Sequence, residues 1–513
     1  MQKLEYYPAG VLEEEIKSNL SINNLLFGKR IKSSQTIPEY LIEFLIAVKS
    51  KKKIADVEYL CGFPESDDIN DHVVQYQPKA YMGLRRFIFF QNSSVEKRSS
   101  VDREAYEKCV EDIKRHITIT NDSIDEDTGV FMLQNFLNSF SVENADRAWF
   151  TKAILPISYN VLFPEALGER KLRANVKMSD VDNISEVDTK FEFNKYTYMA
   201  RGGEIYYLHV LHALNSKDNH GYAEVISNGI DKMLNSMPNI GKLSDFIERE
   251  WLEEEGIDLR DFTISKKMSA IPLDYSLRDN YTVSELANFL SCQIQPMEKI
   301  ELFSFGIIIQ ILRMMFLSAS KNTNHGTGAW IIDVNQKSVR DNSEIKKLAI
   351  KGFENYEAII RQFILDGIEV YYPDKDEGFK EKQIKDAKEN SIGIFRKLGK
   401  EIGMIIPIKG PGMRFTISES VIKFMVMSLV PPECKVTFDK FLDLMYDHFG
   451  IVIAEQHYLD AVNQQCFDGT PNIAPFLNDN RSDFAQKLKS CGFLRDLSDA
   501  TAIVENPYTK EDI

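Results

Sequence analysis

The sequence lacks the short patterns that identify the common classes of enzyme. It contains no Gly-Lys-Ser or Gly-Lys-Thr step of a phosphate-binding loop, and no Gly-x-Ser-x-Gly turn around a nucleophilic serine. Its six cysteines form no Cys-x-x-Cys pair, which disfavours a zinc ribbon or a disulfide framework and suits reduced thiols. We therefore expect a cytoplasmic protein without a cofactor, and we favour a non-catalytic protein over an enzyme.

Long apolar runs are also missing. The N-terminus carries acidic residues where a signal peptide would have its apolar core. The most apolar stretch, from Leu302 to Leu317, is shorter than the ~20 residues of a membrane helix and contains Gln310 and Arg313. We therefore predict a buried helix at this stretch and no membrane partner.

The chain is nevertheless long and apolar enough to form large cores. Its 513 residues are 43% hydrophobic, and at ~150 residues per domain this length suggests roughly three domains. The 77 acidic and 62 basic side chains give a formal charge of -15. This balance disfavours nucleic-acid binding by the whole surface but not by a local basic patch.

Helical periodicity with short apolar hairpins predicts a mainly α, multi-domain protein with tandem winged helices at its C-terminal end. We predict a helical N-terminal domain over 1–145, a helical central domain over 146–340, a first winged-helix-like unit over 341–417 and a second winged-helix domain over 418–513. Near the N-terminus, the spacing predicts a helix over 36–53 that ends in a run of lysines.

The winged-helix prediction depends on a pattern that occurs twice: an amphipathic helix, a glycine and an apolar hairpin. The first copy covers 394–417 and the second 482–508. In the second unit, Thr437 is expected to cap one helix that ends at Gly450, and Ser482 is expected to open the next, which ends at Gly492. Such domains bind DNA or partner proteins.

Charge distinguishes the two units. Residues 375–414 carry ten basic and six acidic side chains, whereas residues 415–513 carry eight basic and fifteen acidic ones. Because phosphate contact dominates DNA affinity, we assign DNA binding to the first unit and protein binding to the second. The predicted DNA contacts are Arg396, Lys397, Lys400, Lys409 and Arg414. The alternative is a hairpin that only packs against its neighbour.

Two other segments carry local signals. Residues 28–53 contain seven basic and two acidic side chains, which form either a face for an acidic partner or a solvated helix end. Thr282 and Glu285 have the spacing of a capping box before an apolar run.

Two histidines are candidate metal ligands. His209 and His212 are three residues apart on one helical face, with His220 eight residues later, but zinc would need a further close pair of ligands. Core or interfacial histidines are the alternative. Arg201 and the two glycines that follow it begin the same helix. In one interpretation, the free backbone N–H groups at this helix start receive an anion. In the alternative, the glycines form a break between two packed helices.

The candidate catalytic residues are His325 and Asp333. A polar loop with glycines carries His325 and leads into a short apolar strand that ends in Asp333, and such loops often hold catalytic groups. The alternative is a plain connection after the buried helix.

The segments RGGEIYYLHVLHAL, residues 201–214, and GFLRDLSDATAIVENPY, residues 492–508, resemble parts of large uncharacterised proteins encoded in bacterial anti-phage defence clusters. The resemblance implies an accessory subunit that works beside an ATPase, methyltransferase or nuclease supplied by another chain, and it assigns no catalytic residue. Our leading hypothesis is a non-catalytic subunit that binds double-stranded DNA and other proteins of a complex. The alternatives are an enzyme acting on nucleic acid near His325 and Asp333, and a transcription regulator.

Overall fold

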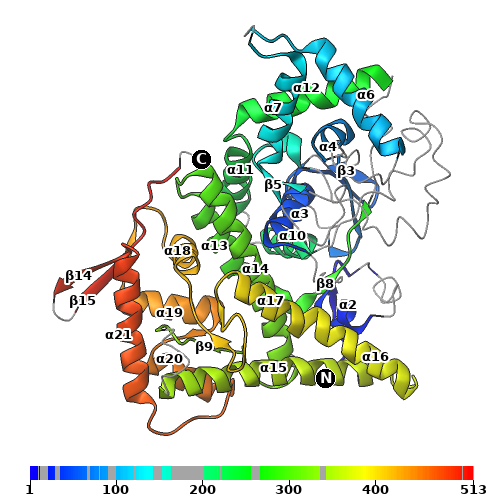
Figure 1. The fold of residues 1–513 in the computed structure, drawn as a ribbon. Helices are drawn as coiled ribbons and strands as arrows, with labels where there is room; N and C mark the ends of the chain where they lie inside the picture. Colours follow the sequence, from blue (N-terminus) through cyan, green and yellow to red (C-terminus); the bar gives the residue numbers. More distant parts are fainter. Residues whose placement is uncertain are drawn as a thin grey trace.

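The computed structural model describes residues 1–9, 11, 21–28, 35–59, 61–65, 70–79, 81–89, 100–120, 123–142, 153–162, 202–216, 218–219, 221–255, 266–335, 343–498 and 501–511. These residues are mainly helical with several small sheets, which confirms the predicted fold class at this level (Figure 1). Arg201, His220 and the basic residues at 29, 30 and 32 lie outside the described residues.

The N-terminal part mixes helices with a small sheet. It contains β1 (Tyr6–Tyr7), α2 (Ile22–Phe27), α3 (Ile37–Lys49), β2 (Lys51–Ile54), β3 (Val57–Tyr59), β4 (Val74–Gln77), α4 (Met82–Phe89), α6 (Ser100–His116), α7 (Glu126–Asn138) and β5 (Ser141–Val142). Strands from the middle of the chain complete its sheets, because β4 pairs with β7 (Lys266–Lys267) and β1 pairs with β8 (Ile271–Pro272).

The middle part is built around long helices. It contains β6 (Ala153–Ile154), a 3-10 turn at Tyr159–Val161, α10 (Gly202–Leu214), α11 (Tyr222–Leu234), α12 (Pro238–Glu255), a 3-10 helix at Leu273–Arg278, α13 (Asp279–Leu290), α14 (Pro296–Asn322) and β9 (Trp330–Ile331). Among the described residues, α14 alone is long and apolar enough to cross a membrane, and 89% of its most apolar window is buried inside the protein.

The C-terminal part has the helix and hairpin order expected from the sequence. It contains α15 (Glu344–Tyr371), α16 (Glu377–Lys388), a π-helical turn at Glu389–Gly393, α17 (Ile394–Glu401), β10 (Ile405–Ile406), β11 (Arg414–Phe415), α18 (Glu419–Leu429), β12 (Lys435–Thr437), α19 (Phe438–Phe449), β13 (Ile451–Val452), α20 (Glu455–Asn463), α21 (Ala474–Ser490), β14 (Leu494–Ser498) and β15 (Thr501–Glu505).

One continuous apolar core connects these parts. The cluster of buried side chains runs from Tyr7 to Val504 and includes most of α14. In Figure 1, α13 and α14 lie near the middle of the molecule, with α3, α4, α6 and α7 above them, α15, α16, α19, α20 and α21 below them, and α18 beside α13. Residues from all four predicted segments therefore contribute to the same core.

Helix α10 packs closely against α3. Gly203 has no side chain, and a Cβ atom there would lie 2.2 Å from the backbone oxygen of Tyr40. The Gly203 N–H donates a 3.1 Å hydrogen bond to the Glu43 carboxylate. The N–H groups at the start of α10 therefore bind a negatively charged group of the same protein, the carboxylate of Glu43.

The predicted helix over 36–53 is too long. Helix α3 ends at Lys49, and the following lysines form strand β2. Lys52 is 2% exposed, and its Nζ donates to the backbone oxygens of Val48 and Ser50 at the end of α3. In a strand, successive side chains point to opposite faces, so Lys52 of β2 points inward between its neighbours. This segment therefore forms a strand, although the apolar residues before it have helical spacing.

In the second C-terminal unit, most of the predicted helix ends are confirmed. The Thr437 hydroxyl accepts a hydrogen bond from the Lys440 N–H, and Gly450 ends α19 in the left-handed conformation. Gly492 also has a positive φ, of 81°, just after α21. The predicted start at Ser482 is wrong, because α21 begins eight residues earlier, at Ala474, with proline in its first turn.

Candidate nucleic-acid interface and buried polar network

The hairpin of the first unit is present where the sequence predicts it. Ile405 pairs with Phe415, and Ile406 pairs with Arg414. Gly410 and Gly412 turn the chain with φ values of 100° and 79°, which glycine adopts at little cost. The loop between the strands extends to the surface and exposes Lys409.

The predicted DNA-contact residues of α17 lie around this hairpin but already have partners. The Lys400 Nζ donates to the backbone oxygen of Ile408 at 3.1 Å, and the Lys397 Nζ donates to that of Gln35 at 3.2 Å. Arg396 makes two hydrogen bonds of 2.5 and 2.6 Å to the Glu357 carboxylate. Lys397 also lies 3.9 Å from the carboxylate of Glu401, whereas the partner of Lys400 is a backbone oxygen, which does not neutralise an ammonium group.

Arg414 is placed differently from the sequence-based prediction. Its side chain is 7% exposed and lies 2.6 Å from the carboxylate of Asp333, which is 4% exposed. This buried ion pair fixes the base of the hairpin to the end of the strand segment that contains β9. In this structure Arg414 does not present its charge to a ligand.

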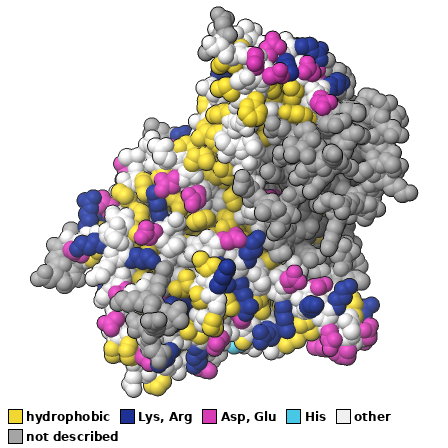
Figure 2. All heavy atoms as spheres, in the orientation of Figure 1, with side chains coloured by type: hydrophobic (Ala, Val, Ile, Leu, Met, Phe, Trp, Pro, Cys, Tyr) yellow, Lys and Arg dark blue, Asp and Glu magenta, His cyan; other side chains and the backbone are white. Residues whose placement is uncertain are grey.

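More lysines flank the hairpin loop from α15. A Cβ atom on Gly412 would lie 3.5 Å from Ile350 of α15, so the loop lies beside this helix. Lys347 and Lys351 on the same helix are exposed. Figure 2 shows further Lys and Arg side chains over α16 and α17, with acidic side chains at the outer end of α16.

The second unit offers less free positive charge. Its hairpin joins a three-stranded sheet with the order β12-β15-β14. Arg481 on α21 bonds to Asp439 at 2.5 Å, and Lys489 bonds to Asp496 at 2.5 Å. Two of its few basic side chains are thus neutralised by neighbouring carboxylates.

The candidate catalytic residues His325 and Asp333 make no hydrogen bond to each other. The ring of His325 bonds to the Thr323 hydroxyl at 3.0 Å, whereas Asp333 is occupied by Arg414. The described contacts therefore do not form a base-and-acid pair from these two residues.

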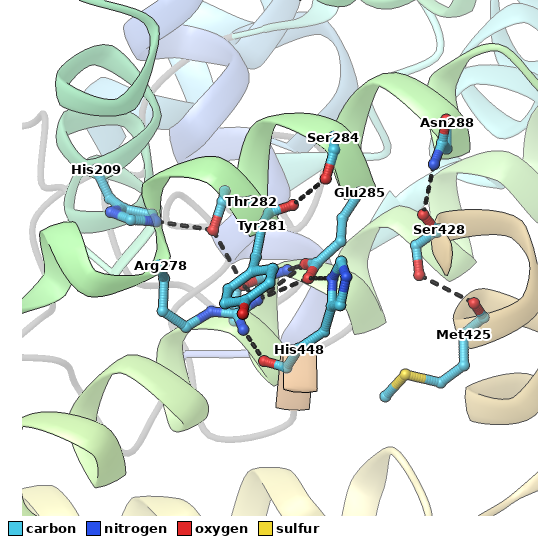
Figure 3. Close-up of polar contacts among 11 residues, drawn as sticks. His209, Arg278, Tyr281, Thr282, Ser284, Glu285, Asn288, Met425, Ser428 and His448 are labelled. Carbon is cyan, nitrogen blue, oxygen red and sulfur yellow. Dashed lines mark hydrogen bonds and ion pairs between the residues drawn. The ribbon is translucent and has the colours of Figure 1, made fainter. Parts of the chain in front are cut away.

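The structure instead brings together a buried polar network that the sequence did not predict (Figure 3). Arg278 donates to both carboxylate oxygens of Glu285, at 3.0 and 2.9 Å, and to the side-chain oxygen of Gln310 at 2.8 Å. His448, at the end of α19, bonds to the same carboxylate at 2.7 Å. Arg278 and Glu285 are each 1% exposed. The network therefore joins α13, α14 and the second C-terminal unit.

The electrostatics of this network favour a charged Glu285. Burial by itself would raise the pKa of Glu285, but the charge of Arg278 and the hydrogen bond from His448 hold the pKa below its ordinary value. The predicted capping box of Thr282 and Glu285 is wrong, because α13 begins three residues before Thr282, at Asp279. Both side chains point into the core, not to the end of the helix.

His209 and His212 belong to a second branch of the network. His209 bonds to the Thr282 hydroxyl at 2.8 Å, and its other ring nitrogen lies 3.6 Å from Asp279, which also bonds to His212 at 2.8 Å. Burial, Arg278 and His212 lower the pKa of His209 well below its ordinary value, so its ring is neutral. Among the described residues, no group of three or more His, Cys, Asp and Glu side chains is arranged to hold a metal ion.

The order of Thr282, His209 and Asp279 is that of a nucleophile, a base and an orienting acid. Thr282 is fully buried, however, so a substrate has no route to its hydroxyl. A cleft of about 450 Å³ reaches only the Asp279 end and is lined by Ser216, Asp218, Ser276, Leu277, Asp279, Asn280 and Tyr281. The arrangement gives the Thr282 hydroxyl and one nitrogen of the His209 ring a hydrogen-bond partner, whereas the other ring nitrogen and one oxygen of Asp279, 3.6 Å apart, are buried without a hydrogen bond among the described residues.

A sequence signal for the network does exist. Asp279, Thr282 and Glu285 recur every three residues on one face of α13, and Gln310 is polar within an apolar run. Polar side chains that share a buried helical face need partners from another helix.

Comparison of the chain with protein-family models, with curated proteins and with solved structures finds no match.

Proposed function

We propose that this protein is a non-catalytic subunit that binds DNA and other proteins within a multi-protein complex. We propose further that the DNA-binding surface surrounds the β10–β11 hairpin. The observation that carries this proposal is the set of lysines around an exposed loop. A cytoplasmic role in bacterial anti-phage defence is the setting that we propose, and it depends on the resemblance of two segments alone.

The winged-helix part of the proposal has its best support in the second unit. In a winged helix, a helix-turn-helix is followed by a hairpin that joins a small antiparallel sheet. Strands β12 and β14 both pair antiparallel with β15, and helices α19, α20 and α21 come between β12 and β14 along the chain. The first unit departs from this pattern. Its hairpin strand β11 also pairs with the segment after β9, and this pairing, between Phe415 and Ile332, is parallel.

Charge supports DNA binding by the first unit. Between Lys382 and Lys409 the chain carries seven basic side chains and three acidic ones, and Lys347 and Lys351 of α15 lie on the other side of the loop. Each lysine that contacts a phosphate releases condensed counterions, which is the main source of sequence-independent affinity. The acidic second unit is then the surface that we propose for a partner protein.

The test is a salt titration of DNA binding. The change is the double charge reversal Lys351→Glu and Lys409→Glu, and the matched control reverses two exposed lysines of the second unit, Lys435→Glu and Lys440→Glu. We expect the first double variant to bind a 30-base-pair duplex more weakly and to reduce the log-log slope against salt by about two, since each lost phosphate contact lowers it by about one.

The control variant should keep the slope of the unchanged protein. A slope that falls only in the control would move the DNA contact to the second unit. Absence of duplex binding by the unchanged protein at low salt would refute the DNA-binding part of the proposal.

A further inference from the structure

The loop of the β10–β11 hairpin carries an apolar side chain at its most exposed point. Ile408 is 71% exposed, and among the large apolar side chains that the structure describes the next most exposed, Met132 of α7, reaches 55%. An isoleucine this exposed buries little apolar area, so burial stabilises the free protein little at this position.

The loop is held in place from several sides. Pro407 precedes Ile408 and Pro411 follows Gly410, and the ring of each proline restricts its backbone. The Lys400 ammonium group donates a hydrogen bond to the Ile408 backbone oxygen at 3.1 Å. At the base, the buried pair of Arg414 and Asp333 fixes the second strand. Ile408 is therefore presented on a constrained support.

Lysines lie near this apolar side chain. Lys409 is the next residue and is exposed, and Lys400 approaches the loop from α17. Lys351 is exposed on α15, beside the opposite side of the loop at Gly412, and Lys347 on the same helix is paired with Glu344 at 2.7 Å. The surface thus combines one apolar projection with lysines at and beside the loop.

This combination has a known physical use on DNA. Proteins that bind the minor groove insert an apolar side chain between two base pairs, and basic side chains hold the phosphates on either side. Unstacking a base step costs a few kcal/mol, which phosphate contacts and burial of the apolar side chain offset. Pyrimidine–purine steps such as TA unstack most readily.

We propose that Ile408 inserts between base pairs in the minor groove and bends the duplex. This inference rests on the proposed DNA-binding function and adds to it the groove and the distortion of the DNA. Lys409 and Lys400 contact the phosphates beside the inserted side chain. Arg414 supports the loop from within the protein and does not touch the DNA.

The test uses an A·T-rich duplex with several TA steps, in which one adenine of each step is replaced by 2-aminopurine and the ends carry a donor and an acceptor dye. The fluorescence of 2-aminopurine rises when its base is unstacked, and energy transfer between the dyes rises when the duplex bends. We expect both signals to rise on binding of the full chain. Ile408→Ala should lose at least half of each signal at saturating protein. The matched control is Leu459→Ala, which truncates another exposed apolar side chain, 51% exposed on α20, and should keep both signals.

The outcomes separate this inference from the proposed function. Binding without any rise in either signal, or signals that survive in Ile408→Ala, would overturn the insertion and leave DNA binding intact. Failure of the unchanged protein to bind the duplex at low salt would overturn both. In a parallel arm with vesicles containing anionic lipid, binding that requires Ile408 in the absence of duplex binding would assign the loop to a lipid surface and also overturn the inference.

Discussion

Replacing Gly203 by alanine tests the close contact between α10 and α3. Alanine is the better helix former by about 1 kcal/mol, so an isolated helix would be stabilised by this change. In this protein the new Cβ atom would lie 2.2 Å from the Tyr40 oxygen and 2.5 Å from the Phe44 nitrogen. Both atoms are backbone of α3, so a change of side-chain rotamer cannot relieve the contact.

The expected magnitude follows from the groups that must separate. Overpacking of a core costs about 1–3 kcal/mol, and moving the helices apart also weakens the hydrogen bond between the Gly203 N–H and the Glu43 carboxylate, worth about 1.5–3 kcal/mol. After the gain in helix propensity, Gly203→Ala should lower the free energy of unfolding by roughly 2 kcal/mol or more.

The matched control is Gly393→Ala. Gly393 has helical backbone angles, φ -61° and ψ -45°, and a Cβ atom there would approach nothing closer than 3.8 Å. The same substitution should therefore leave stability unchanged or raise it by up to about 1 kcal/mol. Urea unfolding followed by circular dichroism measures both variants. A Gly203→Ala variant as stable as Gly393→Ala would refute the close approach of the two helices.

Two further predictions concern buried charges. Burial, opposed by Cys61 and assisted by Lys49, lowers the pKa of Lys52 from 10.5 to about 7. The folded protein then binds fewer protons than the unfolded chain between pH 7 and 10.5, so Lys52 makes the free energy of unfolding rise with pH in this window, by up to about 1.4 kcal/mol per pH unit. Thermal unfolding of Lys52→Met from pH 7 to 10 should lack this rise, and an unchanged profile contradicts the prediction. Asp333→Asn and Arg414→Met should each cost about 3 kcal/mol by leaving one buried charge unpaired, whereas the double variant should recover much of that loss. Losses that simply add in urea unfolding would argue against the ion pair.

The sequence predicts correctly the features that a few neighbouring residues decide. The cap at Thr437 and the helix end at Gly450 need only a hydroxyl and a left-handed glycine within one turn of the helix. The hairpin between residues 405 and 415 follows from two apolar strands and a loop with Gly410 and Gly412. The buried helix α14 follows from an apolar stretch that contains Gln310 and Arg313, although the helix itself, at 27 residues, is longer than that stretch.

Tertiary structure decides which polar side chains of these elements are available for function. Arg414 and Asp333 are 81 residues apart, and Glu285 and His448 are 163 apart. Helical or strand spacing shows which residues share a face, but not which element covers that face. The sequence by itself thus determined the hairpins and some helix ends, such as those at Thr437 and Gly450, because those depend on contacts within a few residues. The end of α3 and the start of α21 did not follow from it. Only the packing of distant segments decided that Ile408 lies at the exposed end of the loop and that Arg414 supports the loop from within the protein. A charged side chain is buried only when a partner of opposite charge compensates for its lost hydration, and the partner of Arg414 is distant in the sequence.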